Sequence, residues 1–327
     1  MNWTNKKVLV TGAGGFIGSH LTERLVGLGA ETKALVRYNS LSTYGWLDHS
    51  NVKDSIEIVS GDICDGPNMR AALRGIDIVF HLAALISVTY SYENPDAFVR
   101  TNVEGTVNVF QAALDTGVGL VIHTSSSEVY GSARYAPIDE AHPLQGQSPY
   151  AASKIGADKM AESFYRSMEL PVAVIRPFNT YGPRQSARAV IPAIITQALT
   201  QPTIRLGSLS PIRDFNYVSD TVDGYIRMAE SPAAVGEVIN VGSGRSISIG
   251  ELAENIIKLV GSGTTIEQDD QRLRPKDSEV DRLIADNKKA KNVIGWEPQH
   301  SLEKGLTEVI EWIKSNLDHY QPGIYVT

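Results

Sequence analysis

Three glycines, spaced three residues apart, follow a short apolar stretch near the start of the chain. Lys7–Val10 has the continuous apolar character of a strand that is buried on both faces. Gly12, Gly15 and Gly18 come directly after it, at the start of a helical stretch. Glycines in this place allow a tight turn and a close approach to a pyrophosphate, and the N-terminus of the helix favours the anion. The spacing departs from the usual G-x-G-x-x-G. Its position between a strand and a helix nevertheless predicts a dinucleotide-binding loop rather than a plain structural turn.

Strand-like and helix-like segments alternate through the first half of the chain. Helices are expected at about residues 95–113 and 150–168. Alternation of this kind predicts an α/β fold with a doubly wound parallel sheet of the Rossmann type. Apolar stretches predict the strands that follow the first one at Glu31–Val36, Ile56–Val59, Ile76–His81, Leu120–His123 and Pro171–Arg176.

The alternation breaks after residue 176. One helix is expected at about Val190–Leu199 and one more core strand at Val238–Val241, and most of the remainder is helical. We therefore expect a cofactor-binding domain over residues 1–178 and a smaller, mostly helical substrate domain over residues 179–327. Segments after residue 213 are able to return to the sheet.

Composition and charge narrow the classes of protein. The 327 residues carry 30 basic and 37 acidic side chains, a net charge of −7, which argues against a basic nucleic-acid surface. Cys64 is the one cysteine, so neither an internal disulfide nor a Cys/His metal site is expected. No apolar run of about 18 residues and no secretory leader is evident. We expect a cytoplasmic protein without a metal, a membrane or a nucleic acid as partner.

Tyr150 and Lys154 are four residues apart and share one face of the predicted helix. A nearby lysine favours tyrosinate and lowers the pKa of the tyrosine, which can then take a proton from a substrate hydroxyl. A Tyr-x-x-x-Lys pair alone is common on exposed helices. Its position after a dinucleotide loop favours a catalytic pair that acts on an alcohol.

A serine-rich segment follows the strand Leu120–His123, at the edge of the sheet where functional residues gather. Ser126 and Ser127 could form an ordinary turn, and Glu128 could be a solvated loop residue. The order Ser126, Tyr150, Lys154 along the chain favours catalytic roles for the segment.

The end of the second strand lacks the acidic residue that often binds the ribose 2′-hydroxyl. Arg37 stands there instead, which favours NADP slightly over NAD. An arginine can also stack on adenine or lie free on the surface. The segment Tyr38–His49 is long for a strand–helix connection and contains Trp46. We expect it to close over the cofactor or to pack against a second subunit, rather than only onto its own domain.

Taken together, these residues resemble the extended short-chain dehydrogenase/reductases that act on nucleotide sugars. The resemblance implies that Asp62 and Ile63 contact adenine, and that Ser126, Tyr150 and Lys154 carry the hydride chemistry. It also implies a nucleotide-diphosphate sugar as substrate and a tightly bound NAD or NADP. The residues that carry the resemblance are Gly12, Gly15, Phe16, Ile17, Gly18, Asp62, Ile63, His81, Leu82, Ala83, Ala84, Asn102, Ser126, Tyr150, Lys154 and the stretch Arg176–Pro183.

Within this family, Ser127-Glu128 is the discriminating pair. A glutamate at this point resembles the 4,6-dehydratases, which move the C5 proton of the sugar and form a 4-keto-6-deoxy product. Glucose-type dehydratases have Asp-Glu, whereas GDP-mannose dehydratase and UDP-glucuronate decarboxylase have Ser-Glu. The group that protonates the leaving C6 hydroxyl is therefore open. The alternatives are a 4-epimerase, a UDP-glucuronate decarboxylase and, from another class, a non-catalytic NAD(P)-binding protein.

Further stretches, at residues 36–48, 184–192 and 213–218, resemble the dehydratases of legionaminic-acid-type pathways, which implies a nucleotide-linked N-acetylglucosamine. A diphosphate needs arginines. The predicted substrate-binding residues are Asn179, Arg188, Arg213 and Arg274. The resemblance also implies a homodimer or homotetramer formed through the helices at about Pro95–Leu114 and Tyr150–Met168.

Overall fold

Seven parallel strands form the central sheet of the computed structural model, which describes residues 1–320. Their order is β11-β6-β5-β4-β1-β2-β3, a doubly wound arrangement that confirms the predicted fold class. The sheet starts from β1 and extends in both directions, so the carboxyl ends of β1 and β4 lie at the point where the strand order reverses. The strands are β1 (Lys7–Thr11), β2 (Glu31–Val36), β3 (Ile56–Ser60), β4 (Ile78–His81), β5 (Leu120–Thr124), β6 (Val172–Pro177) and β11 (Val238–Val241).

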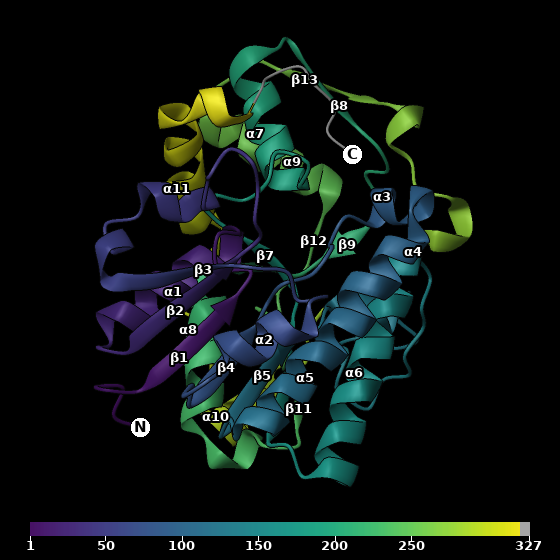
Figure 1. Ribbon diagram of the computed structural model, residues 1–327. Coiled ribbons are helices and arrows are strands. Elements are labelled where there is room, and N and C mark those ends of the chain that lie inside the picture. Colours follow the sequence, from purple (N-terminus) through teal and green to yellow (C-terminus); the bar gives the residue numbers. More distant parts are fainter. Residues whose placement is uncertain (321–327) are drawn as a thin grey trace.

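Helices cover both faces of this sheet (Figure 1). Within β1, Val8 and Val10 belong to one apolar core, whereas Leu9 belongs to the core on the opposite face. The continuous apolar strand predicted from the sequence is thus buried on both sides. The core around Leu9 includes residues of α2 (Gly66–Ala72), α5 (Gly105–Thr116) and α6 (Pro149–Met168), and the other includes residues of α1 (Phe16–Gly27), α8 (Val218–Glu230) and α10 (Lys288–Ile294).

The second half of the chain adds a smaller body beside the carboxyl edge of the sheet, at the top of Figure 1. Strand β11 pairs with β6, so the chain returns to the main sheet after residue 213. The elements of this body are the strand pairs β7 (Asn179–Tyr181) with β10 (Phe215–Tyr217), β8 (Thr203–Leu206) with β13 (Thr265–Gln268) and β9 (Ile212–Arg213) with β12 (Ile247–Ser248), and the helices α7 (Val190–Thr200), α9 (Ile249–Val260) and α11 (Leu302–Ser315).

The helix expected at about residues 95–113 is not regular. It consists of α4 (Pro95–Phe98), a π-helical segment (Val99–Glu104) and α5 in succession. The short helix α3 (Val88–Glu93) precedes them. Asn102 lies in the π-helical segment, and its side chain bonds both backbone groups of Leu85 and the hydroxyl of Ser153. The wider turn therefore places an amide that ties α6 to the loop after β4.

The segment at residues 38–49 packs onto its own chain. Its end forms a short 3₁₀ helix (Gly45–His49) in which the Trp46 ring lies 5.9 Å from Trp312 of α11 and 5.5 Å from His319. Tyr44 and Gly45 also line a cavity that the glycine loop borders. The segment thus lies beside the glycine loop and contacts the C-terminal half through Trp46. Among residues 1–320, no helix combines the length and apolar character that crossing a membrane requires.

Candidate active site

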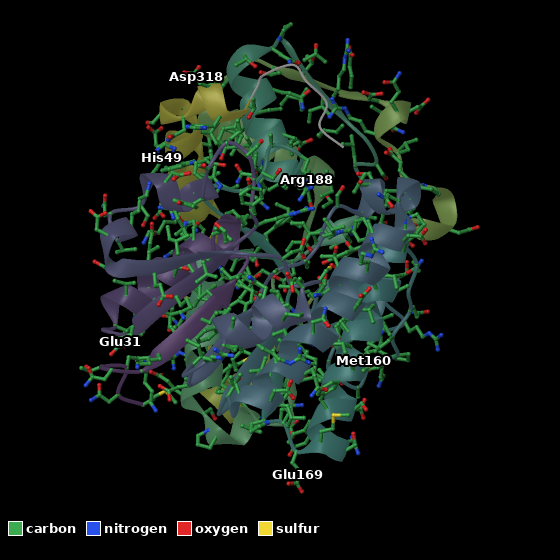
Figure 2. The ribbon with its side chains drawn as sticks, in the orientation of Figure 1. Glu31, His49, Met160, Glu169, Arg188 and Asp318 are labelled. Carbon is green, nitrogen blue, oxygen red and sulfur yellow. The ribbon has the colours of Figure 1, made fainter. Side chains whose placement is uncertain are left out.

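One cavity of about 960 Å³ lies between the carboxyl edge of the sheet and the second half of the chain. Figure 2 shows Arg188 between these two parts. All residues predicted for the site from the sequence line this cavity, which brings segments more than 200 residues apart to one place. They are Gly12, Gly15, Phe16, Ile17, Gly18, Arg37, Asp62, Ile63, Leu82, Ala83, Ala84, Ser126, Ser127, Glu128, Tyr150, Lys154, Asn179, Arg188, Arg213 and Arg274.

The glycine loop leaves no room for a side chain at Gly12 or Gly18. Gly12 has a φ of +69°, and a Cβ there would lie 2.9 Å from the backbone nitrogen of Ala83. A Cβ on Gly18 would lie 2.2 Å from the carbonyl oxygen of Gly12. Helix α1 begins after Gly15, which has no side chain to cap its first N–H groups. These free donors and the bare backbone fit the pyrophosphate of a dinucleotide.

The adenine end of the cavity carries the residues predicted for cofactor choice. Arg37 is 81% exposed, and its Nε lies 3.9 Å from the carboxylate of Asp62. Ile63 is buried and packs against Gly105 at the start of α5, where a Cβ would clash with it. The carboxylate of Asp62 thus balances part of the Arg37 charge.

Tyr150 and Lys154 lie on the first turns of α6, which begins after the N-cap Ser148. Both side chains are buried, and Lys154 Nζ donates to the carbonyl oxygen of Thr124 at 2.5 Å. Burial lowers the pKa of Lys154 to about 8. Burial raises the pKa of Tyr150 to about 12, although a hydrogen bond with Ser126 opposes this. The prediction from the sequence that the pKa of Tyr150 is lowered is therefore wrong for the protein without ligands. Removal of the phenolate from water outweighs the contacts that stabilise it.

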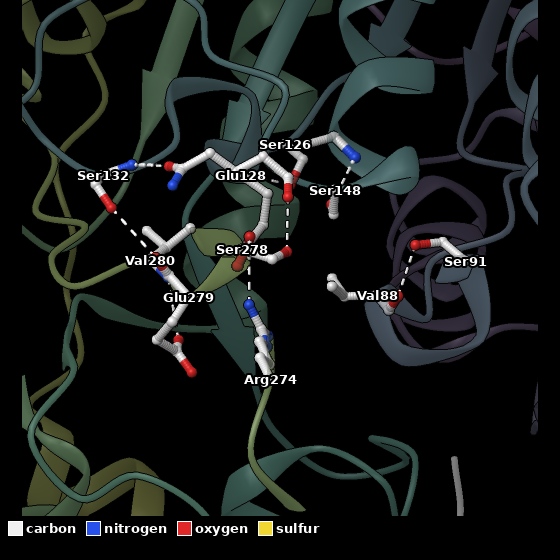
Figure 3. A network of polar contacts seen from close by, with 12 residues as sticks. Val88, Ser91, Ser126, Glu128, Ser132, Ser148, Arg274, Ser278, Glu279 and Val280 are labelled. Carbon is white, nitrogen blue, oxygen red and sulfur yellow. Dashed lines mark hydrogen bonds and ion pairs between the residues drawn. The ribbon is translucent and has the colours of Figure 1, made fainter. Parts of the chain in front are cut away.

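Ser126, Ser127 and Glu128 follow the carboxyl end of β5, and the last two begin a 3₁₀ helix labelled η4 (Ser127–Tyr130). Ser126 caps this helix by accepting a hydrogen bond from the Glu128 backbone at 3.2 Å, and Ser127 is buried. Figure 3 shows the Glu128 carboxylate directed toward Arg274, with 3.6 Å between Oε2 and Nη1. One hydroxyl thus contacts the tyrosine and orients the glutamate segment.

The predicted substrate residues bring three guanidinium groups to the other wall, of which those of Arg213 and Arg274 are paired with glutamates. Arg213 is buried and pairs with Glu279 at 3.3 Å. Burial lowers the pKa of Arg188 and of Arg213, but arginine stays charged near neutral pH. The side-chain oxygen of Asn179 is buried, with no hydrogen-bond partner among residues 1–320. An anionic, hydrogen-bonding ligand would satisfy these groups.

Several cavity residues were not predicted from the sequence. Gly14 is one, because a Cβ there would lie 2.4 Å from the carbonyl oxygen of Tyr44. Thr124 supplies the acceptor for Lys154, and its place at the end of β5 was an available signal. Glu279 carries no such signal, because it lies within a polar loop and reaches the cavity only through the tertiary fold.

Comparisons with known proteins agree with this geometry. The family model described as GDP-mannose 4,6 dehydratase matches residues 9–309. A UDP-glucose 4-epimerase from Mycolicibacterium smegmatis is 36% identical over 94% of this chain and 99% of its own. The dTDP-glucose 4,6-dehydratase DesIV from Streptomyces venezuelae, solved with NAD bound, has a TM-score of 0.89 and 30% identity over 97% of this chain and 99% of that one.

A further solved structure handles N-acetylated sugars. It is a UDP-N-acetylglucosamine 4-epimerase from Methanobrevibacter ruminantium in complex with UDP-N-acetylmuramic acid. The TM-score is 0.86, with 32% identity over 96% of this chain and 99% of that one.

Proposed function

Because the chain belongs to the extended short-chain dehydrogenase/reductase family of NAD-dependent nucleotide-sugar dehydratases and epimerases, we propose that it is a nucleotide-sugar 4,6-dehydratase. Its product is a 4-keto-6-deoxy sugar. The observation that carries the proposal is the placement of Glu128 in the same cavity as Tyr150, two residues beyond the serine that contacts this tyrosine. A carboxylate beside the redox pair serves an elimination and has no task in a plain 4-epimerisation.

Tyr150 is the base of the first step. It takes the proton of the 4-hydroxyl, while the Lys154 cation and the Ser126 hydroxyl stabilise the developing phenolate. Lys154, with a pKa of about 8, remains mostly protonated at neutral pH. A bound nicotinamide would supply the redox chemistry by accepting a hydride from C4 and donating one to C6, so the whole cycle would need no external oxidant or reductant.

Glu128 carries the second step. The 4-keto group makes the C5 proton acidic, and Glu128 removes it. The proton that Glu128 has gained leaves with the C6 hydroxyl as water. When hydride reaches C6, C5 takes a proton from solvent, and Tyr150 releases the 4-hydroxyl proton to solvent, so the cycle balances. Ser127 directly precedes Glu128, so its buried hydroxyl is available to the departing oxygen.

Arg188, Arg213 and Arg274 are proposed to hold the diphosphate, with Asn179 bonded to the sugar nucleotide. An N-acetylglucosamine nucleotide is proposed as the substrate, supported by the sequence resemblance and by the relative that binds UDP-N-acetylmuramic acid. Residues 1–178 together with β11 would bind the cofactor, and the remainder of the second half would bind the nucleotide sugar.

NAD is proposed as the tightly held cofactor. The solved relative DesIV holds NAD. The Asp62 carboxylate lies beside Arg37 and would repel the 2′-phosphate of NADP. The slight preference for NADP that Arg37 suggested also has no support in the comparisons. The residues of the glycine loop, Arg37 and Asp62 would bind its two phosphates and its adenosine.

A homodimer or homotetramer formed through the helical layer of α4, α5 and α6 is proposed, in the cytoplasm. Val99, Leu114, Tyr165 and Met168 are large apolar side chains exposed on that layer, which a second copy would cover. Light scattering of the purified protein measures the assembly directly.

A 4-epimerase is the second candidate, favoured by the 36% identity with the Mycolicibacterium enzyme. Product analysis separates the two functions. Wild-type protein is incubated with UDP-N-acetylglucosamine, UDP-glucose, dTDP-glucose and UDP-glucuronate, and the products are identified by NMR. We expect a 4-keto-6-deoxy product from the wild type and none from Glu128→Gln. A C4-inverted or decarboxylated sugar without any 6-deoxy product would overturn the dehydratase proposal.

A further inference from the structure

A buried ion pair lies beneath the reacting groups and is not part of the mechanism described above. Asp158 is one helical turn beyond Lys154 on α6, and Arg176 is on β6. Arg176 donates to the Asp158 carboxylate from Nε at 3.2 Å and from Nη2 at 2.8 Å. Both side chains are about 95% buried. The cost of removing two charges from water can cancel their attraction, so a buried ion pair need not stabilise the fold. We therefore looked for a functional role of this pair.

The carboxylate of this pair anchors the first residue of the catalytic segment. Ser125 Oγ donates to Asp158 Oδ2 at 2.7 Å, the same oxygen that Arg176 binds. The Ser125 backbone nitrogen also donates to Ile175 on β6 at 2.8 Å. Ser125 is therefore fixed by side chain and backbone, directly before Ser126.

The guanidinium of Arg176 contacts Tyr130, at the other end of the segment Ser125–Tyr130. Arg176 Nη1 donates to the Tyr130 hydroxyl at 3.0 Å, and its guanidinium carbon lies 5.0 Å from the centre of the tyrosine ring. The Tyr130 hydroxyl in turn donates to Asn240 of β11 at 2.7 Å. Tyr130 is the last residue of η4, two residues after Glu128.

A buried histidine, which is neutral at neutral pH, also faces the pair. His123 Nε2 lies 3.5 Å from the other oxygen of Asp158, and burial lowers the pKa of this histidine. The hydrogen bonds that the Asp158 carboxylate accepts come from Arg176 and from the Ser125 hydroxyl, which are the contacts that lead to the catalytic segment. Its charge also raises the pKa of Lys154, against the effect of burial.

We propose that Asp158 and Arg176 are positioning residues, because one buried ion pair holds both ends of the Ser125–Tyr130 segment. Ser126 and Glu128 lie between the two anchors and are thereby fixed relative to Tyr150. The role of Glu128 as a base rests on the proposed dehydratase function. The role of Ser126 beside Tyr150 applies to any redox reaction at this site. Reacting groups must keep their geometry closely, and a misplacement of about 1 Å can lower a rate roughly 100-fold.

Two variants break one anchor each. Tyr130→Phe removes a single hydroxyl from the guanidinium end, and Asp158→Asn keeps the shape but removes the charge. Glu162→Gln is the matched control, because Glu162 lies one turn further along α6 and forms exposed pairs with Lys159 and Arg166. The first readout is amide hydrogen exchange of residues 125–131 in the protein without sugar nucleotide, and the second is the split of kcat from KM.

We expect faster exchange in residues 125–131 for both variants. We also expect kcat to fall about 10-fold for Tyr130→Phe and about 100-fold for Asp158→Asn, with KM and UDP affinity within about twofold of wild type. Glu162→Gln should match wild type throughout. The proposal is overturned if kcat stays unchanged in both variants, if exchange in this segment stays unchanged, or if UDP affinity falls together with kcat. These readouts apply whether the wild-type product is a 6-deoxy or a C4-inverted sugar, so a failure of the dehydratase proposal is seen separately.

Discussion

The two ends of the cavity are built in different ways. At the cofactor end, the backbone of Gly12, Gly14, Gly15 and Gly18 forms part of the surface, and the absence of side chains at these glycines is the essential property. At the reacting end, Glu128, Tyr150 and Arg274 converge from three distant segments, and their functional groups form the surface. We therefore expect added atoms to weaken binding at the cofactor end. At the reacting end, we expect removed or misplaced atoms to lower the rate of reaction.

The largest effect is expected from adding one methyl group at the cofactor end. In Gly18→Ala the new Cβ would lie 2.2 Å from the Gly12 carbonyl oxygen, so the loop must shift away from the pyrophosphate. We expect more than about 100-fold weaker NAD binding by calorimetry, equivalent to roughly 3 kcal/mol. Gly27→Ala at the end of α1 is the control, because its Cβ meets nothing within 4 Å. Similar NAD affinity in the two variants would refute the backbone account.

The second effect tests the reacting end by removing one oxygen atom. Tyr150→Phe deletes the proposed base and leaves the ring in place, so kcat should fall at least about 100-fold. NAD affinity should remain close to that of wild type, which separates this end from the glycine loop. Turnover of the folded variant close to that of wild type would rule out Tyr150 as the base.

Arg274→Gln should affect substrate binding rather than the cofactor. A charge-assisted hydrogen bond contributes roughly 1.5–3 kcal/mol, so we expect KM for the sugar nucleotide to rise about 10-fold or more. Arg282→Gln is the control, since this arginine is exposed on the same loop. An unchanged KM in steady-state kinetics would remove Arg274 from the diphosphate site.

The smallest effect is expected at Arg37. Its side chain is largely exposed and faces Asp62, so solvent and the carboxylate screen its charge. Arg37→Ala should weaken NAD binding by no more than about threefold. A much larger loss for NADP than for NAD would show that Arg37 selects the 2′-phosphate. Equal losses would mean that Arg37 contacts adenine or no part of the cofactor.

The contrast between the two ends also explains what the sequence could predict. The glycine loop and β1 are local, since spacing and apolar character within about twelve residues determine them, and both were predicted. The π-helical segment at Val99–Glu104 was missed, because its reason is the contact of Asn102 with Leu85 and Ser153. The raised pKa of Tyr150 was missed as well, since helical spacing reports the neighbour Lys154 but not the burial that dominates.

The sequence predicted the arginines of the site but not the residues that they contact. Arg213 and Arg274 were predicted to bind substrate, and both line the cavity. Their partners Glu279 and Glu128 depend on the path of the chain through β9 and the following loops, which no sequence period encodes.

The central claim is that Glu128 moves the C5 proton of a sugar that Tyr150 has begun to oxidise. The direct measurement is turnover of a sugar nucleotide in D₂O, with NMR and mass spectrometry of the product from wild type and from Glu128→Gln. The account predicts a 4-keto-6-deoxy product with deuterium at C5 from wild type. Glu128→Gln should give neither, while it still reduces bound NAD, seen as absorbance from the reduced nicotinamide. A C4-inverted product without deuterium at C5, formed equally well by both proteins, would contradict it.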